Sequence, residues 1–344
     1  MRLPERIDTE TELENTLAEP SDADLECVAR LNGDVLILGA GGKMGPSLAR
    51  RVHRAVTRTG STSRVVAASR FSSAAARASL DAEGIQTLAC DLLDPARIAA
   101  LPRCPYVLFL AGRKFGTLDR TDITWATNTV VPARVAEHFC QSRMVVFSTG
   151  NVYPMVHARG PASTEDDLPA PVGEYAQSCL GRERVVEFVS REQGMAAVVF
   201  RLNYAVDLRY GTLVDVARRV FAGEAIDLTV GFFNAIWQGD ANSYALRSLE
   251  LASSPPALLN VTGPERIAVR DAAQWFGSMF ERPPRFVNTE GPVALLSDSS
   301  RCRGRLGEPS VPLSVLQQWV AHWVQAGGRS LNKPTHFEVT DGRF

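Results

Sequence analysis

The sequence predicts an α/β fold, with a doubly wound parallel sheet and a smaller C-terminal lobe. Three observations lead to this expectation. Short apolar runs alternate with helical patterns through residues 34–149, an order typical of parallel sheets. The runs are apolar along their whole length, as expected for strands that are buried on both faces. The first run leads directly into a glycine-rich turn and then into a helix.

The glycine-rich turn belongs to the stretch DVLILGAGGKMG near the N-terminus. Gly39, Gly42 and Gly45 are spaced G-x-x-G-x-x-G, whereas Met44 occupies the third position of the more familiar G-x-G-x-x-G. Such glycines permit a sharp turn, let backbone N–H groups approach a pyrophosphate and let the following helix, expected over 46–56, pack closely. The helix N-terminus adds partial positive charge. The stretch therefore predicts a dinucleotide site.

The bulk composition argues against nucleic-acid and membrane partners. Of the 344 residues, 45% are hydrophobic and 22% are charged, and the net charge is −1, so no excess of positive charge favours such partners. No apolar run approaches membrane-spanning length, and the N-terminus lacks the apolar segment of a signal peptide, so a cytoplasmic protein is expected. The six cysteines form no C-x-x-C pair and no metal-like spacing with the five histidines. We therefore expect reduced thiols and no metal.

The second apolar run, 64–70, ends in Ser69 and Arg70. The residue at the end of this strand normally contacts the adenosine ribose, where an acidic side chain accepts a hydrogen bond from the 2′-hydroxyl of NAD. An arginine suits a 2′-phosphate instead, although arginines after strands are also common at surfaces. Lys43 in the glycine turn is expected to add positive charge nearby. NADP is therefore expected in preference to NAD.

A short strand over 84–88 leads to Asp91 and Leu92. An aspartate at this turn can bind the edge of an adenine ring, and it can equally cap the helical segment that follows it. Both residues are candidate cofactor contacts.

The fourth strand, expected over 105–112, ends in Ala111 and Gly112, and Lys114 follows in the loop at its carboxyl end. Ligands of open α/β sheets bind beside such loops. Asn128 falls in the next helix. These four residues are further candidates for contact with the cofactor.

The rest of the chain continues the α/β pattern. A fifth strand is expected over 143–149. The later elements are expected to be strands over 194–206 and 258–262 and helices over 213–223, 242–252, 269–280 and 313–325.

These motifs together resemble the extended short-chain dehydrogenase/reductase family, in its NAD-dependent epimerase/dehydratase group, whose fold is the Rossmann sheet. FLAGRKFG is particularly similar to the loop of sugar-nucleotide 4-epimerases, in which the lysine, Lys114 here, lies along the cofactor. The resemblance covers most of the chain. The matching pieces are GAGGKMG, CDL at 90–92, FLAGRKFG at 109–116, Asn128, FSTGNVYP at 147–154, STEDDLPAPVGEYAQS at 163–178 and NVTGPERIAVRDAA at 260–273.

The resemblance implies a catalytic hydroxyl at Thr149 and a catalytic tyrosine at Tyr175, which opens YAQSCLGRE where the family shows Y-x-x-S-K-x-x-x-E. The position of the family lysine is Cys179. In the family this lysine lowers the pKa of the tyrosine and holds the nicotinamide ribose, so Tyr175 and Cys179 also occupy cofactor-binding positions. A neutral thiol does neither job. Each pKa unit that is not removed costs about tenfold in tyrosinate, so the usual oxidation of an alcohol is expected to be impaired.

Three alternatives follow from the missing lysine. In the first, another cation substitutes for it, either Lys114 at the same sheet edge or Arg182 one turn beyond Cys179. In the second, the enzyme reduces a carbonyl, with protonated Tyr175 as the acid and Thr149 orienting the carbonyl. In the third, the protein binds the dinucleotide without catalysis, as a sensor or regulator. The retained Thr149 and Tyr175 favour an enzyme.

The resemblance also implies a function, a partner and a domain plan. We expect an NAD(P)-dependent oxidoreductase or epimerase/dehydratase that acts on a polar, sugar-like small molecule. A homodimer is expected through the helices that carry Asn128 and Tyr175. The plan comprises a helical extension over 1–33, a dinucleotide-binding domain over 34–200 and about 236–262, a substrate lobe with a C-terminal helix over 201–235 and 263–326, and a tail over 327–344.

The extension and the tail lie outside the resemblance. Thr9 and Glu12 have capping-box spacing, so a short helix is expected there, and a second over 22–31. The extension either packs on the body or contributes to a subunit interface. The tail either wraps the body or a neighbour, or is disordered.

Overall fold

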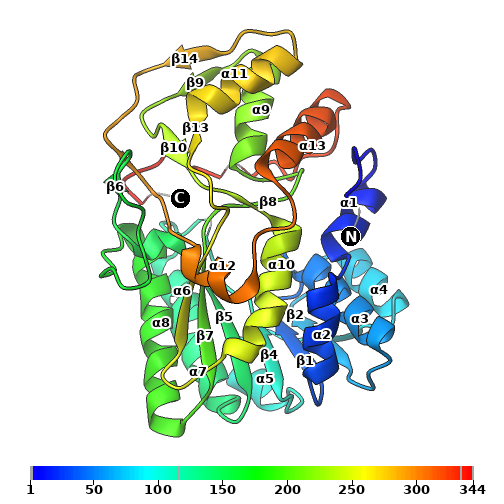
Figure 1. Cartoon of the computed structure of the whole chain (residues 1–344). Helices are drawn as coiled ribbons and strands as arrows, with labels where there is room; N and C mark the ends of the chain where they lie inside the picture. Colours follow the sequence, from blue (N-terminus) through cyan, green and yellow to red (C-terminus); the bar gives the residue numbers. More distant parts are fainter. Residues whose placement is uncertain (1–2, 115, 334, 343–344) are drawn as a thin grey trace.

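A parallel sheet of seven strands forms the centre of the molecule in the computed structural model, which describes residues 3–114, 116–333 and 335–342 (Figure 1). The strands are β1 (Val35–Leu38), β2 (Val65–Ser69), β3 (Gln86–Ala89), β4 (Tyr106–Phe109), β5 (Arg143–Thr149), β7 (Ala197–Leu202) and β12 (Ala257–Val261). Their spatial order is β12-β7-β5-β4-β1-β2-β3, and every neighbouring pair is parallel. The expected doubly wound α/β fold is confirmed.

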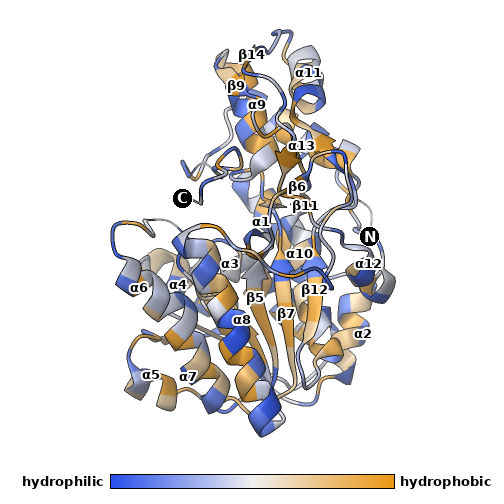
Figure 2. Cartoon of the chain, turned by 90° about the vertical axis from the view of Figure 1, so that its left-hand side faces the viewer, coloured by the Kyte–Doolittle hydropathy of each residue, from blue (hydrophilic) through white to orange (hydrophobic). Residues whose placement is uncertain are grey.

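Helices cover both faces of the sheet, because successive strand residues point to opposite sides. Val35 and Ile37 of β1 pack against one helical layer, and Leu36 and Leu38 pack against the other. Figure 2 shows the central strands as hydrophobic. The first layer contains α2 (Asp22–Arg30), α3 (Gly45–Thr59) and α10 (Gln238–Arg247), and the second contains α5 (Pro95–Ala99), α7 (Val131–His138) and α8 (Gly173–Gln193).

Two expected elements differ from the observed ones. The helix expected over 242–252 is α10, which begins at Gln238 and gives way to the 3-10 helix η3 (Ser248–Leu251). The strand expected over 194–206 is divided into β7 and β8 (Ala205–Val206). Between them Tyr204 has a φ of +50°, a left-handed conformation that ends one strand and redirects the chain.

The N-terminal extension packs on the body of the molecule through α1 (Glu10–Ala18) and α2. Both helices begin with capping boxes, and the first is the expected one at Thr9. Asp24 of α2 is buried and accepts hydrogen bonds from Arg51 of α3 at 2.8 Å and from Ser243 of α10 at 2.6 Å. Because breaking a buried pair leaves an uncompensated charge, the extension is an integral part of the main domain.

The second lobe has its own apolar core, formed around three helices and short strand pairs. Trp319 and Trp323 are almost fully buried in it, so the apolar stripe of the last helix belongs to the core. The three helices are α9 (Thr212–Ala222), α11 (Val269–Met279) and α13 (Leu313–Gln325).

The two parts of the molecule exchange segments. Leu13 and Leu17 of α1, in the extension, lie in the core of the second lobe. Conversely, Cys302 and Leu306 of α12 (Ser300–Leu306) lie in the core under the main sheet, although the sequence assigns this segment to the lobe. The remaining elements are α4 (Ala74–Ala82), α6 (Thr121–Trp125), the π-helix η1 (Ala126–Val130), η2 (Gly150–Val152), β6 (Val156–His157), β9 (Ala225–Asp227), β10 (Phe232–Phe233), β11 (Ile236–Trp237), β13 (Ile267–Ala268), β14 (Arg285–Val287) and β15 (Val293–Ala294).

The C-terminal tail wraps the body, which is one of the alternatives that the sequence leaves open. It crosses from the second lobe to the start of α8 (Figure 1). The backbone N–H and the hydroxyl of Thr335 donate to Asp215 of α9 at 2.8 and 2.6 Å. Phe337 is 1% exposed and packs on Phe233. The tail therefore has a defined path between the two lobes.

Candidate functional site

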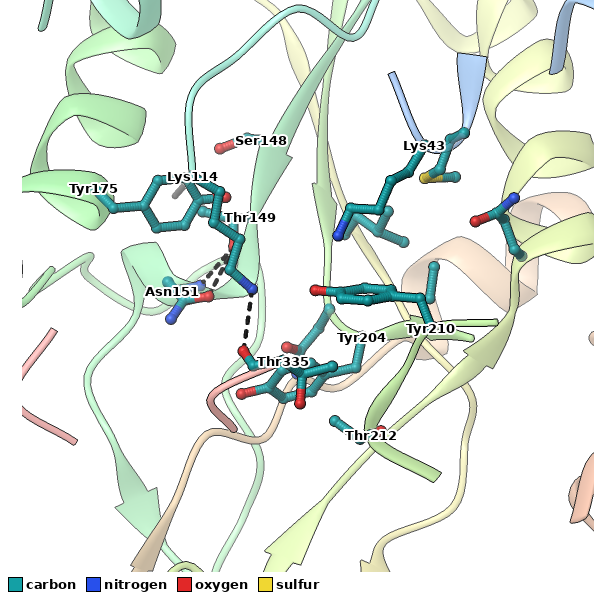
Figure 3. Close-up of a pocket in the computed structure, with 15 residues that line it drawn as sticks. Lys43, Lys114, Ser148, Thr149, Asn151, Tyr175, Tyr204, Tyr210, Thr212 and Thr335 are labelled. Carbon is teal, nitrogen blue, oxygen red and sulfur yellow. Dashed lines mark hydrogen bonds between the residues drawn. The ribbon is translucent and has the colours of Figure 1, made fainter. Parts of the chain in front are cut away.

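A pocket opens at the carboxyl ends of the sheet strands, below the second lobe (Figure 3). Its walls come from the glycine turn after β1, the loop after β4, the end of β5, the start of α8, the chain between β7 and α9, and the tail. This is the edge at which open α/β sheets bind ligands. The lining residues are Lys43, Met44, Lys114, Ser148, Thr149, Asn151, Tyr175, Leu202, Asn203, Tyr204, Ala205, Tyr210, Thr212, Gln238 and Thr335.

The glycine turn has the shape that a dinucleotide requires. Gly39 has a φ of +93°, and a Cβ on it would lie 2.7 Å from the backbone nitrogen of Ala111. A Cβ on Gly45 would lie 2.5 Å from Ala40 Cα, so the helix packs on the turn as closely as only glycine allows. Gly42 lies between them, with a Cβ position 3.2 Å from the carbonyl oxygen of Gly39. The turn and the N-terminus of α3 thus fit a pyrophosphate.

The end of β2 lies beside this turn, since a Cβ on Gly41 would lie 2.7 Å from Ser69 Oγ. Arg70 follows and is exposed at the same edge. Lys43 does not bring its charge here, contrary to the expectation from sequence. Its ammonium lies 3.1 Å from the centroid of the Tyr210 ring, inside the pocket, because the side chain leaves the turn on the other side.

Four further candidate cofactor residues follow β3 and β4. Asp91 is exposed, and its carboxylate accepts a hydrogen bond from the backbone N–H two residues on at 3.1 Å, so it stabilises its own turn. It does not cap the helix that follows, because Asp94 is the N-cap of α5. Leu92 is almost buried. Ala111 lies against the glycine turn, and Gly112 is exposed beside it. Their position along the sheet edge is compatible with contact to the adenosine half of a dinucleotide.

Asn128 does not reach the pocket, although the sequence analysis gives it a cofactor contact. Its side-chain oxygen accepts from the backbone N–H of Arg113 at 2.8 Å and from Arg182 at 2.9 Å. Its amide nitrogen donates to the carbonyl of Arg113 at 2.9 Å and to Ser178 Oγ at 3.0 Å. Because all four bonding positions are used within the protein, Asn128 holds the loop after β4 against α8.

Thr149 and Tyr175 lie together at the wall of the pocket (Figure 3). Thr149 ends β5, and its hydroxyl lies 2.9 Å from Asn151 Oδ1. Tyr175 is half-buried in the first turn of α8. Burial raises the pKa of Tyr175 well above its ordinary value, although the charge of Arg182 and a hydrogen bond with Thr149 lower it. The phenol is therefore protonated at neutral pH.

Cys179 lies one turn after Tyr175 and is only 1% exposed. It packs with Val152 and Tyr153 and is not among the residues that line the pocket, so its thiol does not face the pocket as the expected cofactor contact requires. Burial raises the pKa of its thiol. The side chain at the position of the family lysine is thus a neutral packing group.

Arg182 places a buried positive charge one turn beyond Cys179. Its guanidinium donates to the carbonyl oxygen of Phe147 at 2.6 Å, and to the backbone and side-chain oxygens of Asn128 at 3.2 and 2.9 Å. These acceptors are neutral, so they do not cancel the charge. This positive charge acts to lower the pKa of Tyr175.

Two lysines reach the pocket from opposite walls (Figure 3). Lys114 donates to the carbonyl oxygen of Thr335 in the tail at 3.5 Å. Burial lowers the pKa of Lys114 to about 8, although the charge of Asp215 raises it. Burial, together with the charges of Lys114 and Lys333, lowers the pKa of Lys43 to about 7, against the opposing effect of Asp207 and Asp215.

The far side of the pocket is formed by residues that local sequence patterns do not predict. Tyr204, Tyr210 and Thr212 reach it because the chain turns back at Tyr204 and again between Asp207 and Tyr210. Thr335 reaches it because the tail is folded over the site. The YG pair before the helix at 213–223 was a weak signal for a turn, and nothing local in the tail predicts its path.

The described ranges, 3–114, 116–333 and 335–342, contain no group of three or more histidine, cysteine, aspartate and glutamate side chains that could hold a metal. Within the same ranges, no helix combines the length and the apolar character needed to span a membrane.

A family model described as the NAD-dependent epimerase/dehydratase family matches residues 35–206 of the chain. This region includes the glycine turn, Thr149 and Tyr175. A search of curated proteins finds no match.

Solved structures with the same fold cover most of the chain. UDP-glucose 4-epimerase from Thermotoga maritima with UDP-glucose has a TM-score of 0.69 at 16% identity, over 86% of this chain and 99% of its own. MoeE5 in complex with UDP-glucose and NAD has a TM-score of 0.67 at 19% identity, over 86% and 99%. A short-chain dehydrogenase/reductase superfamily protein from Agrobacterium tumefaciens with bound NAD has a TM-score of 0.70 at 18% identity, over 85% and 97%.

Replacing Lys43 with Met is expected to stabilise the protein below pH 7. The pKa of Lys43 is about 7 in the folded chain and ordinarily 10.5, so the folded chain pays a penalty for the charged amine that is complete below pH 7. Between pH 7 and 10.5 the unfolded chain holds more protons, so the stability of the original protein rises with pH. We expect a gain on the order of 2 kcal/mol at pH 6 that disappears toward pH 10.5.

Urea denaturation of both proteins across this pH range measures the difference. A gain that does not change with pH, or a loss of stability at pH 6, would contradict the assignment of a desolvated amine to Lys43.

Proposed function

This chain belongs to the NAD-dependent epimerase/dehydratase family of enzymes, and we propose that it moves a hydride between a nicotinamide dinucleotide and a sugar-like alcohol or ketone. The observation that carries the proposal is the pairing of Thr149 with Tyr175 at the sheet edge, next to a glycine turn that fits a pyrophosphate. When bound, the dinucleotide supplies the hydride acceptor or donor. The chain supplies the proton and positions the reacting oxygen.

Tyr175 is proposed to exchange the proton. Because burial keeps its pKa high, the phenol is protonated at neutral pH and can donate to a carbonyl oxygen that is being reduced. The hydroxyl of Thr149 lies beside it and can hold the same oxygen. The reverse reaction needs tyrosinate, whose fraction rises about tenfold per pH unit below the pKa. Reduction is therefore favoured at neutral pH and oxidation at alkaline pH.

Two cations are proposed to replace the expected lysine in its two roles, which are to lower the pKa of the tyrosine and to hold ligand hydroxyl groups. Arg182 supplies a fixed buried charge, which acts to lower the pKa of Tyr175. Lys114 lines the pocket beside Tyr175, where its ammonium can donate to hydroxyl groups of a ligand. The net pKa of Tyr175 is nevertheless raised, so these cations replace the lysine only in part.

The alternative function is dinucleotide binding without turnover, as a sensor or regulator. The neutral, buried thiol of Cys179 favours it, because the usual relay through a lysine is broken. The two functions separate in one experiment. A sensor binds the dinucleotide but transfers no hydride to or from any sugar nucleotide at any pH.

Sugar nucleotides are proposed as the first substrates to test. The solved structures with this fold include proteins that bind UDP-glucose, and the pocket presents hydroxyl, amide and amine groups. Such groups suit a polar, hydroxylated ligand.

Tyr175→Phe is expected to lower the rate of hydride transfer by about 100-fold or more, because the proton donor is lost. Dinucleotide affinity should change little. Cys179→Lys is expected to raise the rate of alcohol oxidation at pH 7 by about tenfold, since one unit off the pKa of Tyr175 has that effect. Formation of reduced nicotinamide from an accepted sugar nucleotide measures both.

Cys140→Lys adds the same charge away from the pocket and serves as the matched control. If Cys179→Lys and Cys140→Lys behave alike with an accepted substrate, the missing cation does not limit the reaction.

NADP is proposed as the preferred cofactor, because Arg70 is exposed at the end of β2 and no acidic side chain precedes it there.

Arg70→Asp should weaken NADP binding by about tenfold or more and favour NAD, since the aspartate repels a 2′-phosphate and accepts a hydrogen bond from a 2′-hydroxyl. Calorimetric titration with both cofactors checks this. Arg103→Asp, at an exposed arginine before β4, is the control. Unchanged NADP affinity in Arg70→Asp would show that Arg70 does not contact the phosphate.

A homodimer is proposed through α7 and α8, which lie on one side of the molecule (Figure 2), and through η1, which packs against both. Phe188 of α8 is 64% exposed and Val130 of η1 is 44% exposed, so two large apolar side chains are open to solvent on these elements. Phe188→Glu should convert a dimer to a monomer in light scattering at micromolar concentration. Phe221→Glu, at an exposed phenylalanine of α9, should leave the mass unchanged. A monomeric original protein would refute this interface.

A further inference from the structure

The lysines of this chain are few and are gathered at one place. Of the 37 basic residues, Lys43, Lys114 and Lys333 are the three lysines, and the other 34 are arginines. Lys43 and Lys114 line the pocket. Lys333 lies in the tail, two residues before Thr335, which lines the pocket too. Three distant parts of the sequence thus bring all the lysines to one site, while arginines serve the rest of the surface.

The two pocket lysines approach the same space (Figure 3). Lys43 extends over the face of the Tyr210 ring, with its ammonium 3.1 Å from the ring centroid. Lys114 comes from the opposite wall and reaches the tail at the carbonyl oxygen of Thr335, 3.5 Å away. The charge of Lys114 contributes to lowering the pKa of Lys43, after the larger effect of burial. A ligand between them meets positive charge from both sides.

The two acidic residues near these amines, Asp207 and Asp215, accept hydrogen bonds from other residues. Asp215 accepts two hydrogen bonds from Thr335, at 2.6 and 2.8 Å. Asp207 accepts from Arg209, with bonds of 2.5 and 2.9 Å. Arg209 compensates the charge of Asp207. The donors on Thr335 are neutral and leave the charge of Asp215 in place. One uncompensated carboxylate thus acts on the two lysine amines, so the space between them keeps a net positive potential.

A buried hydroxyl group, that of Thr212, belongs to the same pocket as the amines of Lys43 and Lys114. Thr212 is fully buried and lines the pocket, and its Oγ1 has no hydrogen-bond partner among the residues that the structure describes. A buried hydroxyl without a partner costs free energy, so its presence in a pocket points to a polar ligand group. Tyr204, held at a φ of +50°, presents its ring to the same space. Strained residues of this kind concentrate at ligand sites.

We propose that the part of the pocket around these groups is a subsite for an anionic group of the substrate, a carboxylate or a phosphate carried near the reacting carbon, bound by Lys43 and Lys114 with the Thr212 hydroxyl. The inference rests on the proposed function, because it places the reacting carbon at Thr149 and Tyr175 of the same pocket. The tail, with Lys333 and Thr335, closes the subsite. The substrate class is thus narrowed from polar sugars to acidic or phosphorylated ones.

The cofactor does not account for the direction of the Lys43 side chain. The glycine turn and the N-terminus of α3 already provide backbone N–H groups for the pyrophosphate. Arg70, at the end of β2, is placed for the ribose end. Lys43 starts from the glycine turn but directs its ammonium to Tyr210, toward the second lobe. The ammonium of Lys43 therefore lies away from the turn that fits the pyrophosphate, on the side of the pocket that Tyr210 lines.

The test is calorimetric titration of the protein, saturated with whichever of NAD and NADP it binds more tightly, with UDP-glucuronate and UDP-glucose, which differ in one carboxylate. Removing a charged hydrogen bond weakens binding by about tenfold or more, so UDP-glucuronate should bind at least about tenfold more tightly. Lys43→Met and Lys114→Met should each abolish most of this preference. Lys43→Arg and Lys114→Arg should retain part of it.

A second pair of titrations determines whether the anionic group is a carboxylate or a phosphate. D-glucuronate and D-glucose 6-phosphate are each titrated against D-glucose, so that a carboxylate and a phosphate are compared on one sugar. A lysine-dependent preference for either acid supports the subsite and identifies its source. Lys333→Met should also weaken binding of the preferred acid. The loss of affinity should be smaller than in Lys43→Met or Lys114→Met, because Lys333 is exposed.

Two results would overturn the inference. One is equal affinity for every acidic probe and its neutral counterpart. The other is that Lys43→Met and Lys114→Met lose affinity for the dinucleotide while their affinity for the acidic ligands stays unchanged. That result would show that the lysines bind the cofactor. If the free acids bind through the lysines but no sugar nucleotide is turned over, the subsite stands and the proposed hydride transfer fails. The two proposals can therefore fail separately.

Discussion

The buried ion pair between Glu183 of α8 and Arg201 of β7 fixes the geometry on which the site depends. Arg201 donates to Glu183 at 2.6 Å, and both side chains are almost fully buried. Ser148 at the end of β5 donates to the same carboxylate at 2.5 Å, and Arg201 also donates to the hydroxyl of Tyr153. The pair thereby joins the helix that carries Tyr175 to the strand that ends in Thr149. Breaking one partner would leave a buried charge without compensation, so the arrangement is strongly constrained.

This constraint holds α8 in place whichever side chain stands at position 179, where the sequence pattern leads us to expect a lysine. Cys179 fills the position with a small apolar group that packs under Tyr175, and the helix stays in place because Glu183 holds it. Positive charge has not disappeared from the site. It comes from Arg182 below the tyrosine and from Lys114 beside it. The chemistry that remains is that of a protonated phenol, which is suited to donating a proton to a carbonyl.

The sequence predicts the sheet, and it places Thr149 and the glycine turn at the carboxyl ends of its strands, because both features depend on local patterns. Apolar runs identify the strands, and glycine spacing identifies the turn at Gly39. The sequence does not predict the other wall of the pocket, because long-range packing forms it. Tyr204 lines the pocket through a left-handed residue conformation, and Thr335 reaches it through contacts with Asp215, more than a hundred residues away. Asn128 shows the same limit, since its place in the helix is predictable but the engagement of its amide with Arg113 and Arg182 is not.

The measurement that tests the central claim most directly is the pH dependence of hydride transfer in both directions. The protein is reconstituted with oxidised or reduced dinucleotide, mixed with an accepted sugar nucleotide or its keto form, and followed by the absorbance of reduced nicotinamide. Because Tyr175 is held protonated, oxidation of the alcohol should accelerate about tenfold per pH unit from neutral pH upward, whereas reduction should stay constant over the same range. Oxidation that is already independent of pH at neutrality, or no transfer in either direction, would contradict the account.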